Sequence, residues 1–174
     1  DPFGDKKLLP SGRLRESLKG LNRANEIIIT KTNLAGLCEV DQISSELEKY
    51  SKSIRFSHFN SSLLINGDVM NTKLLLGLHV MVVSAIAKPE NIYKTVSSFR
   101  PNQIEQKIFL DHHHYTAKDI ELIYRLKEQM VIDYFVTTEK DWVKISKFIS
   151  SRHKKDWVVI KQNYFVGEKL ETTI

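Results

Sequence analysis

The sequence has a single cysteine, Cys38, and no apolar run of the length that a membrane-spanning helix needs. One cysteine excludes a disulfide within the chain and cannot by itself form a zinc site, which favours a reducing compartment. The longest apolar stretch, Leu74 to Ala87, is interrupted by His79 and is shorter than the roughly 20 residues of a membrane span. No signal-peptide pattern precedes it and the first residue is Asp1 rather than methionine, so we expect a fragment or a processed chain.

Several catalytic motifs are missing as well. None of the seven glycines is followed by lysine, so these residues contain no phosphate-binding loop of the form G-x-x-x-x-G-K-[ST]. The patterns G-x-G-x-x-G and G-x-S-x-G are also absent. We therefore expect no complete catalytic apparatus in this chain.

The composition that remains is that of a soluble globular protein, with 41% hydrophobic and 27% charged residues and no internal repeat. The formal net charge of +5 suits phosphorylated ligands, nucleic acid or an anionic membrane surface. No basic run is long enough to form an arm or patch, so scattered solubilising lysines are the simpler explanation.

Apolar runs and helical periodicities alternate along the second half of the chain. We expect strands at 74–83, 106–110, 134–136 and 157–160, and helices from Pro89, at 117–130 and at 139–149. This alternation predicts an α/β fold, in which a mostly parallel sheet is flanked by helices. The two later helices have start signals that resemble capping boxes, at Thr116 and Thr138.

The first half is more irregular. We expect a short helix that begins at Ser11 or Gly12, a buried strand at 26–30, and an amphipathic helix within 41–50. Residues 51–72 contain an Asn66-Gly67 pair between apolar residues, which predicts a β-hairpin connector. The predicted boundaries are thus 1–50, 51–72 and 73–174.

Three unusual loops follow strands of the predicted parallel sheet: SAIAKP, LDHHHYT and TTEKD. Because the carboxyl ends of parallel strands meet at one edge, where ligands usually bind, these loops are expected to gather there. In the second loop His112 is the candidate functional residue. It could act as a general base, as a hydrogen-bond donor to phosphate when protonated, or as the partner that orients a carboxylate base. We expect His113 and His114 to be surface or capping side chains, and no zinc site, because consecutive residues diverge.

Two segments leave alternatives open. Helix capping explains Thr138 and Asp141, although these hydroxyls and Lys140 would also suit a phosphate. Arg15 offers a fork for phosphate oxygens and Glu16 can hold a metal or orient the arginine, yet such neighbours are also common on helix surfaces.

Six blocks occur in order along the chain: Phe3-Gly4, LLPSGRLRES, RANEIIITK, AIAKPENIY, FLDHHHYT and VTTEKDWVK. Together they resemble the tetraacyldisaccharide 4'-kinase family over nearly the whole chain. The resemblance implies the C-terminal portion of a P-loop-type kinase that transfers the γ-phosphate of ATP, with Mg²⁺, to the 4' hydroxyl of a lipid A precursor, tetraacyldisaccharide 1-phosphate. It also implies that the protein acts at the cytoplasmic face of the bacterial inner membrane. The expected partners are the precursor and the membrane surface, and nucleic acid is not expected as a partner.

The resemblance also implies roles for individual residues. Arg15 and Glu16 are expected near the phosphates or the metal, with Glu16 the one candidate metal ligand, and His112 is expected to assist a carboxylate base that lies upstream. Lys31, in a loop that echoes the base-reading loops of other P-loop proteins, is the candidate cofactor-binding residue; an ordinary strand-to-helix turn is the simpler reading. ATP and Mg²⁺ are expected to bind mainly to upstream parts, so this chain alone should be inactive.

In this family reading, residues 1–50 are the end of the nucleotide domain, 51–72 the connector and 73–174 a C-terminal α/β domain. The sequence departs from the family pattern at Asp5, Ser17 and Ala85, the last in place of a glycine that would allow closer backbone approach. The alternative function is a non-catalytic α/β module that binds an anionic partner, either a lipid headgroup or nucleic acid.

Overall fold

The computed structural model describes residues 3–32, 35–50 and 53–167, which belong to two compact units. Unit 1 takes residues 1–60 and 164–174, and unit 2 takes residues 61–163. The strands are β1 (Ile27–Ile29), β2 (Ile54–Ile65), β3 (Asp68–Met70), β4 (His79–Ser84), β5 (Gln103–Ile108), β6 (Tyr134–Thr138) and β7 (Trp157–Gly167). The α-helices are α1 (Leu37–Leu47), α2 (Pro89–Ser98), α3 (Ala117–Met130) and α4 (Glu139–Ile145), and the 3-10 helices are η1 (Gly4–Lys6), η2 (Leu18–Arg23), η4 (Ser146–Phe148) and η5 (Ser151–Asp156).

The strands are hydrogen-bonded in the order β1-β2-β7-β6-β4-β5, with β3 paired to β2. The pairs β1-β2, β4-β5, β4-β6 and β6-β7 are parallel, and β2-β3 is antiparallel. The predicted α/β fold with a mostly parallel sheet is therefore confirmed. The predicted three-part domain division stays a prediction.

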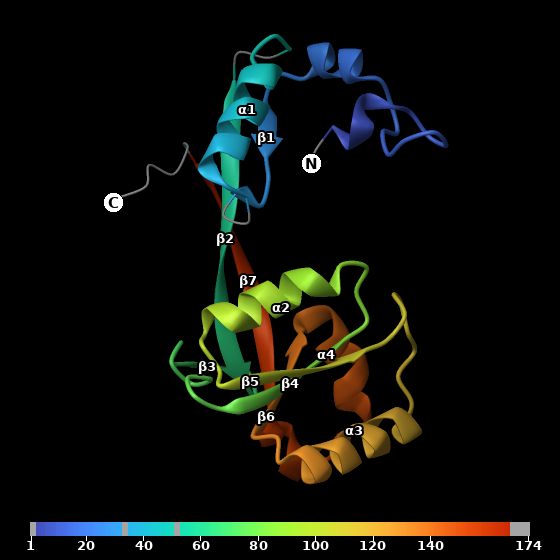
Figure 1. Cartoon of the computed structure of the whole chain (residues 1–174), viewed down its shortest axis with the longest axis vertical. Helices are drawn as coiled ribbons and strands as arrows, with labels where there is room; N and C mark the ends of the chain where they lie inside the picture. Colours follow the sequence, from blue (N-terminus) through green and yellow to red (C-terminus); the bar gives the residue numbers. More distant parts are fainter. Residues whose placement is uncertain (1–2, 33–34, 51–52, 168–174) are drawn as a thin grey trace. The chain divides into compact units, whose positions relative to one another are not determined.

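In unit 2, helices cover both faces of the parallel strands: α2 lies on one face, and α3 and α4 lie on the other (Figure 1). The alternation of β4 explains the two cores, because successive side chains of a strand point to opposite faces. Val80 and Val82 pack with α2, whereas Met81 and Val83 pack with α3 and α4. A strand that is buried on both faces reads as a continuous apolar run, as β4 does.

The hairpin predicted at Asn66-Gly67 is present. Asn66 and Gly67 both have positive φ, at 54° and 94°, and Ile65 pairs with Asp68 on the opposite strand. Two positive φ values match the right-handed twist of the flanking strands, which is why this dipeptide favours tight hairpins. The first strand of the hairpin is longer than a connector needs, since β2 also pairs with β1 at Ile54. Of the predicted connector 51–72, residues 51 and 52 lie outside the described part.

Unit 1 contains a small parallel pair, β1 and β2, which is joined by α1 (Figure 1). The predicted amphipathic helix is confirmed, and it buries Val40, Ile43 and Leu47 against Ile29 and Phe56 of the two strands. Phe3 and Leu21, from the segment that precedes β1, also pack against this small core.

Several predicted boundaries were wrong. The strand expected at 157–160 extends to Gly167 as β7, and the helix expected within 41–50 starts at Leu37 and ends at Leu47 as α1. Four further boundaries have a local explanation. The strand expected at 74–83 begins only at His79, because the chain turns at 71–77, where the Asn71 side chain accepts a hydrogen bond from the Lys73 N–H (2.8 Å) and Gly77 has a φ of 75°. Leu75 in that turn is nevertheless fully buried. Its hydrophobicity therefore reflects core packing and not strand conformation.

The other three boundaries moved for local reasons. The strand expected at 106–110 is β5, which spans Gln103–Ile108. It ends before Leu110 because the chain turns there, where the Leu110 carbonyl accepts a hydrogen bond from the His113 N–H (3.0 Å). The helix expected at 139–149 is α-helical only to Ile145 and continues as η4. The helix expected from Ser11 or Gly12 is instead a turn, and η2 starts at Leu18 with Ser17 as its N-cap.

Within the described ranges, no helix has both the length and the apolar character needed to cross a bilayer.

The core around α3 supplies a stability prediction. Ile123 is fully buried between α3 and the sheet, so Ile123→Ala should lower the free energy of unfolding by about 2–5 kcal/mol, through lost apolar contacts and the cavity that remains. Urea unfolding measures the change. Leu122→Ala, at the exposed neighbouring position, is the matched control and should change stability by less than about 1 kcal/mol. Equal losses in the two variants would contradict the packing described here.

Candidate functional site

The three loops that were predicted to gather at the carboxyl edge of the unit 2 sheet do meet there. The N–H of Ala85, directly after β4, donates to the Asp141 carboxylate in α4 (3.0 Å). Lys140 of α4 donates to Asp111 in the loop after β5 (3.4 Å). All three loops follow parallel strands, whose carboxyl ends lie at the same edge of the sheet, as the prediction assumed.

His112 is displayed on this edge. Its imidazole is exposed, with a side chain 79% accessible, and its backbone has a left-handed φ of 63°. Its N–H donates to the carboxylate of the preceding Asp111 (3.0 Å), and its Nε2 lies 3.7 Å from the other Asp111 oxygen. A residue other than glycine with positive φ is uncommon, and such strain gathers at functional sites.

Asp111 is held ionised by its neighbours. Desolvation by itself would raise the pKa of this carboxyl, but attraction to His112 and the hydrogen bond from Lys140 outweigh it and lower the pKa. The loop therefore presents an anionic carboxylate directly beside the His112 imidazole.

His113 anchors the same loop. It is half-buried, its Nε2 lies 3.1 Å from Asp119 Oδ2, and its ring stacks on Phe109 at 4.6 Å between centroids. Its carbonyl accepts a hydrogen bond from Lys144 (3.2 Å). The expectation of a capping role fits His113, since Asp119 belongs to the capping box of α3 with Thr116. His114 is exposed.

Both predicted helix starts have a threonine N-cap. Thr116 and Asp119 form a complete capping box, and Thr138 accepts from the Asp141 N–H (3.2 Å). Asp141 does more than cap. Its carboxylate is fully buried and also accepts from Ala85, a contact that the sequence did not signal. The Ala85 methyl is buried in the core, so the departure from glycine is accommodated.

Arg15 and Glu16 lie in unit 1, after a tight loop. Leu14 and Lys7 close this loop through backbone hydrogen bonds, and Gly12 packs so closely that an added Cβ would lie 2.4 Å from the Lys7 carbonyl oxygen. Arg15 is exposed, and Glu16 forms an exposed ion pair with Arg23 of η2 (2.7 Å). Sequence reasoning missed both the loop closure and the Arg23 partner.

Lys31 follows β1 with a left-handed φ of 61° and an exposed side chain. Its neighbour Thr32 donates to the Ser57 carbonyl of β2 (3.2 Å), which fixes the turn. Asn33, the last residue of the predicted base-reading loop, lies outside the described residues. The role of Lys31 in cofactor binding stays a prediction.

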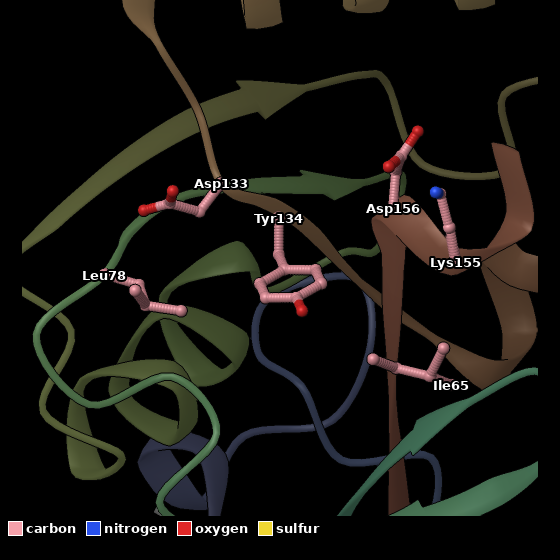
Figure 2. Close-up of a pocket in the computed structure, with 6 residues that line it drawn as sticks. All are labelled: Ile65, Leu78, Asp133, Tyr134, Lys155 and Asp156. Carbon is pink, nitrogen blue, oxygen red and sulfur yellow. The ribbon is translucent and has the colours of Figure 1, made fainter.

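A pocket of ≈ 530 Å³ lies at the opposite, amino edge of the unit 2 strands. It is lined by Ile65, Leu78, Asp133, Tyr134, Lys155 and Asp156, and Figure 2 shows the Tyr134 ring between Leu78 and Ile65 in that view. Its lining residues precede or begin the strands β4, β6 and β7, except Ile65 at the end of β2. His112 follows a strand, so it does not belong to this pocket.

The comparison with known families decides the relationship. A family model described as tetraacyldisaccharide-1-P 4'-kinase matches residues 1–174. The chain belongs to this kinase family. The resemblance carried by the six sequence blocks is thereby confirmed.

Individual members of the family show the same relationship. A tetraacyldisaccharide 4'-kinase of Bdellovibrio bacteriovorus is 33% identical over 146 residues, which cover 83% of this chain and 43% of that protein. One of Halothermothrix orenii is 31% identical, with 84% and 42% covered, and one of Flavobacterium johnsoniae is 29% identical, with 96% and 50% covered. This kinase-family chain therefore spans two fifths to one half of these relatives. No solved structure matches it.

The packing of Gly12 gives a prediction for the loop before Arg15. Gly12→Ala should destabilise this loop by about 1–3 kcal/mol, because the added methyl would meet backbone that cannot move aside cheaply. Limited proteolysis at residues 7–15 measures the effect as faster cleavage. Gly167→Ala, where nothing lies within 4 Å, is the control and should leave this cleavage unchanged. Equal cleavage of Gly12→Ala and wild type would contradict the close packing.

The capping box gives a prediction about pH. Desolvation would raise the pKa of Asp119, but hydrogen bonds from Thr116 and the contact with His113 lower it overall. Ionised Asp119 therefore contributes stability that is fully present above about pH 4, the ordinary carboxyl value, and is lost as the pH falls through the folded-state pKa. Asp119→Asn should lower stability at pH 7 and flatten the decline below about pH 4. Chemical unfolding across pH measures both, with the exposed Asp68→Asn as control.

Proposed function

We propose that the full-length protein transfers the γ-phosphoryl group of ATP to the 4' hydroxyl of tetraacyldisaccharide 1-phosphate. The family match over the whole chain is the observation that carries this proposal, and the relatives bear the name of that activity. Phosphoryl transfer depends mainly on positioning and on stabilising the charge that spreads over the phosphoryl oxygens.

His112 is proposed to assist the carboxylate base that takes the proton of the attacking hydroxyl. An exposed imidazole on a loop that is anchored by hydrogen bonds can bind such a carboxylate and orient it. The adjacent Asp111 carboxylate, which accepts a hydrogen bond from Lys140, lies 3.7 Å from His112 Nε2 and can orient the imidazole. The base itself is proposed to lie upstream of this chain.

Arg15 is proposed to bind phosphate oxygens. Among the described residues its guanidinium has no ion-pair or hydrogen-bond partner, so its donors are available to a ligand. A guanidinium fork suits phosphate because it donates two parallel hydrogen bonds. Glu16, paired with Arg23, is proposed to order the segment that presents Arg15.

Glu16, whose exposed carboxylate forms an ion pair with Arg23, is proposed as the one candidate metal ligand of this chain. Within the described part of the chain, histidine, cysteine, aspartate and glutamate side chains form no group of three or more that could hold a metal. We infer that ATP and Mg²⁺ bind mainly to other parts of the full-length protein, with Lys31 as a further candidate contact to the nucleotide. The isolated chain is accordingly proposed to be inactive.

The site of action is proposed to be the cytoplasmic face of the bacterial inner membrane, where a substrate with four acyl chains is held by the bilayer. A net charge of +5 supports contact with an anionic membrane surface. Nucleic acid is not proposed as a partner.

Substitution of His112 and Arg15 in the full-length protein tests this function. His112→Gly keeps the left-handed backbone accessible and removes the imidazole, and should lower kcat by about 10²-fold or more. Added imidazole should restore part of the activity. Arg15→Ala should lower kcat/KM by at least about tenfold, with less loss for Arg15→Lys. The assay follows transfer of labelled phosphate from ATP to the lipid acceptor.

The control for His112 is His114→Ala, an exposed histidine of the same loop, which should retain wild-type kcat. Wild-type turnover in both His112→Gly and Arg15→Ala would remove the assigned roles. If the full-length protein transferred no phosphate to this acceptor, the proposed reaction itself would be wrong.

A further inference from the structure

Two lysines of α4 bind the residues on either side of His112. Lys140 Nζ donates to the carboxylate of Asp111 (3.4 Å), and Lys144 Nζ donates to the carbonyl of His113 (3.2 Å). The lysines are four residues apart, so they project from the same face of the helix. The segment that carries His112 is thus held once before the histidine and once after it.

The contact of Lys144 is the stronger of the two by its surroundings. It is half-buried, and its charged donor meets a backbone carbonyl, a type of hydrogen bond that is stronger than one between neutral groups. Lys140 is more exposed, and exposed ion pairs contribute little to stability. Both lysines contact the His112 loop, and Lys144 is the better anchor.

The support from which the lysines extend is itself fixed. Asp141, the residue after Lys140, is fully buried and accepts hydrogen bonds from the Ala85 N–H (3.0 Å) and the Thr138 hydroxyl (3.2 Å). These contacts tie the first turn of α4 to the ends of β4 and β6. The start of α4, from which the lysines extend, is therefore fixed relative to the sheet by buried contacts.

The loop is also held from α3. Asp119 of α3 contacts the His113 imidazole at 3.1 Å, while Lys144 of α4 holds the carbonyl of the same residue. Phe109 stacks on the His113 ring. The His112 side chain lies between these anchors and is exposed, on a backbone with positive φ.

We propose that Lys140 and Lys144 are positioning residues that hold His112 in the orientation needed for phosphoryl transfer, and that they do so without contacting the substrate. This inference rests on the proposed kinase function. Their effect on the rate should pass through His112, because a misplacement of about 1 Å of a reacting group lowers rates up to about 10²-fold.

The test uses the full-length protein and compares Lys140→Met, Lys144→Met and the double variant with Lys147→Met. Lys147 is an exposed lysine two helical turns from Lys140 and serves as the matched control. Methionine keeps most of the apolar stem and removes the donor. We expect kcat to fall about tenfold in Lys144→Met, somewhat less in Lys140→Met and more in the double variant, with KM for both substrates within about twofold of wild type.

A second comparison isolates the route of the effect. In a His112→Gly background, Lys144→Met should lower kcat by less than about twofold further, because residues that act as one unit are not additive. Lys144→Arg should restore much of the rate, since it again donates to the His113 carbonyl. Hydrogen exchange of the amides at residues 110–114 should be faster in Lys144→Met than in Lys147→Met.

The outcomes separate the inference from the proposed function. Wild-type kcat in the double variant, or a full additional loss in the His112→Gly background, would overturn the positioning role and leave the kinase function standing. A rise of KM for the acceptor with unchanged kcat would show that the lysines bind substrate directly, which also overturns it. If the wild-type protein transferred no phosphate, the kinase function would fail, and unchanged hydrogen exchange at 110–114 would then overturn the structural part of the inference.

Discussion

The buried carboxylate of Asp141 is the interaction on which the candidate edge of unit 2 depends. One of its oxygens accepts from the Ala85 N–H and from Thr138, so a single group joins the end of β4, the end of β6 and the start of α4. A buried charge is stabilised only where hydrogen bonds replace water. Because α4 is fixed in this way, Lys140 and Lys144 can reach the loop that carries His112 from a defined position.

The region beneath this edge contains several buried polar groups. Asp141 Oδ1, the Tyr115 hydroxyl and the Thr137 hydroxyl are buried and have no hydrogen-bond partner among the described residues. Burial raises the pKa of Tyr115, and the carboxylates of Asp141 and Asp119 add to the effect, so this hydroxyl stays protonated. Polar side chains therefore lie directly beneath the candidate edge of the sheet.

Much of the fold could be predicted from local pattern. The helices expected within 41–50 and at 117–130 follow the 3.6-residue period of their apolar residues, although the first spans 37–47 in the structure. The Asn66-Gly67 hairpin follows from backbone freedom at those two positions. Predictions were wrong where apolar residues are buried without regular structure. Leu75 is buried from a turn, and the expected helix start at Gly12 is a closed loop, because neither periodicity nor composition records how closely the backbone packs on itself.

The sequence by itself determined the family, the α/β class and the gathering of the SAIAKP, LDHHHYT and TTEKD segments at one edge, because motif order, periodicity and the direction of parallel strands are all encoded locally. Only the tertiary structure decided which side chains of that edge pack against the core and which are exposed to solvent. His113 turned inward to Phe109 and Asp119, His112 remained exposed, and Asp141 reached a backbone group 56 residues away. Adjacent histidines are chemically identical in a sequence, and only packing distinguishes them.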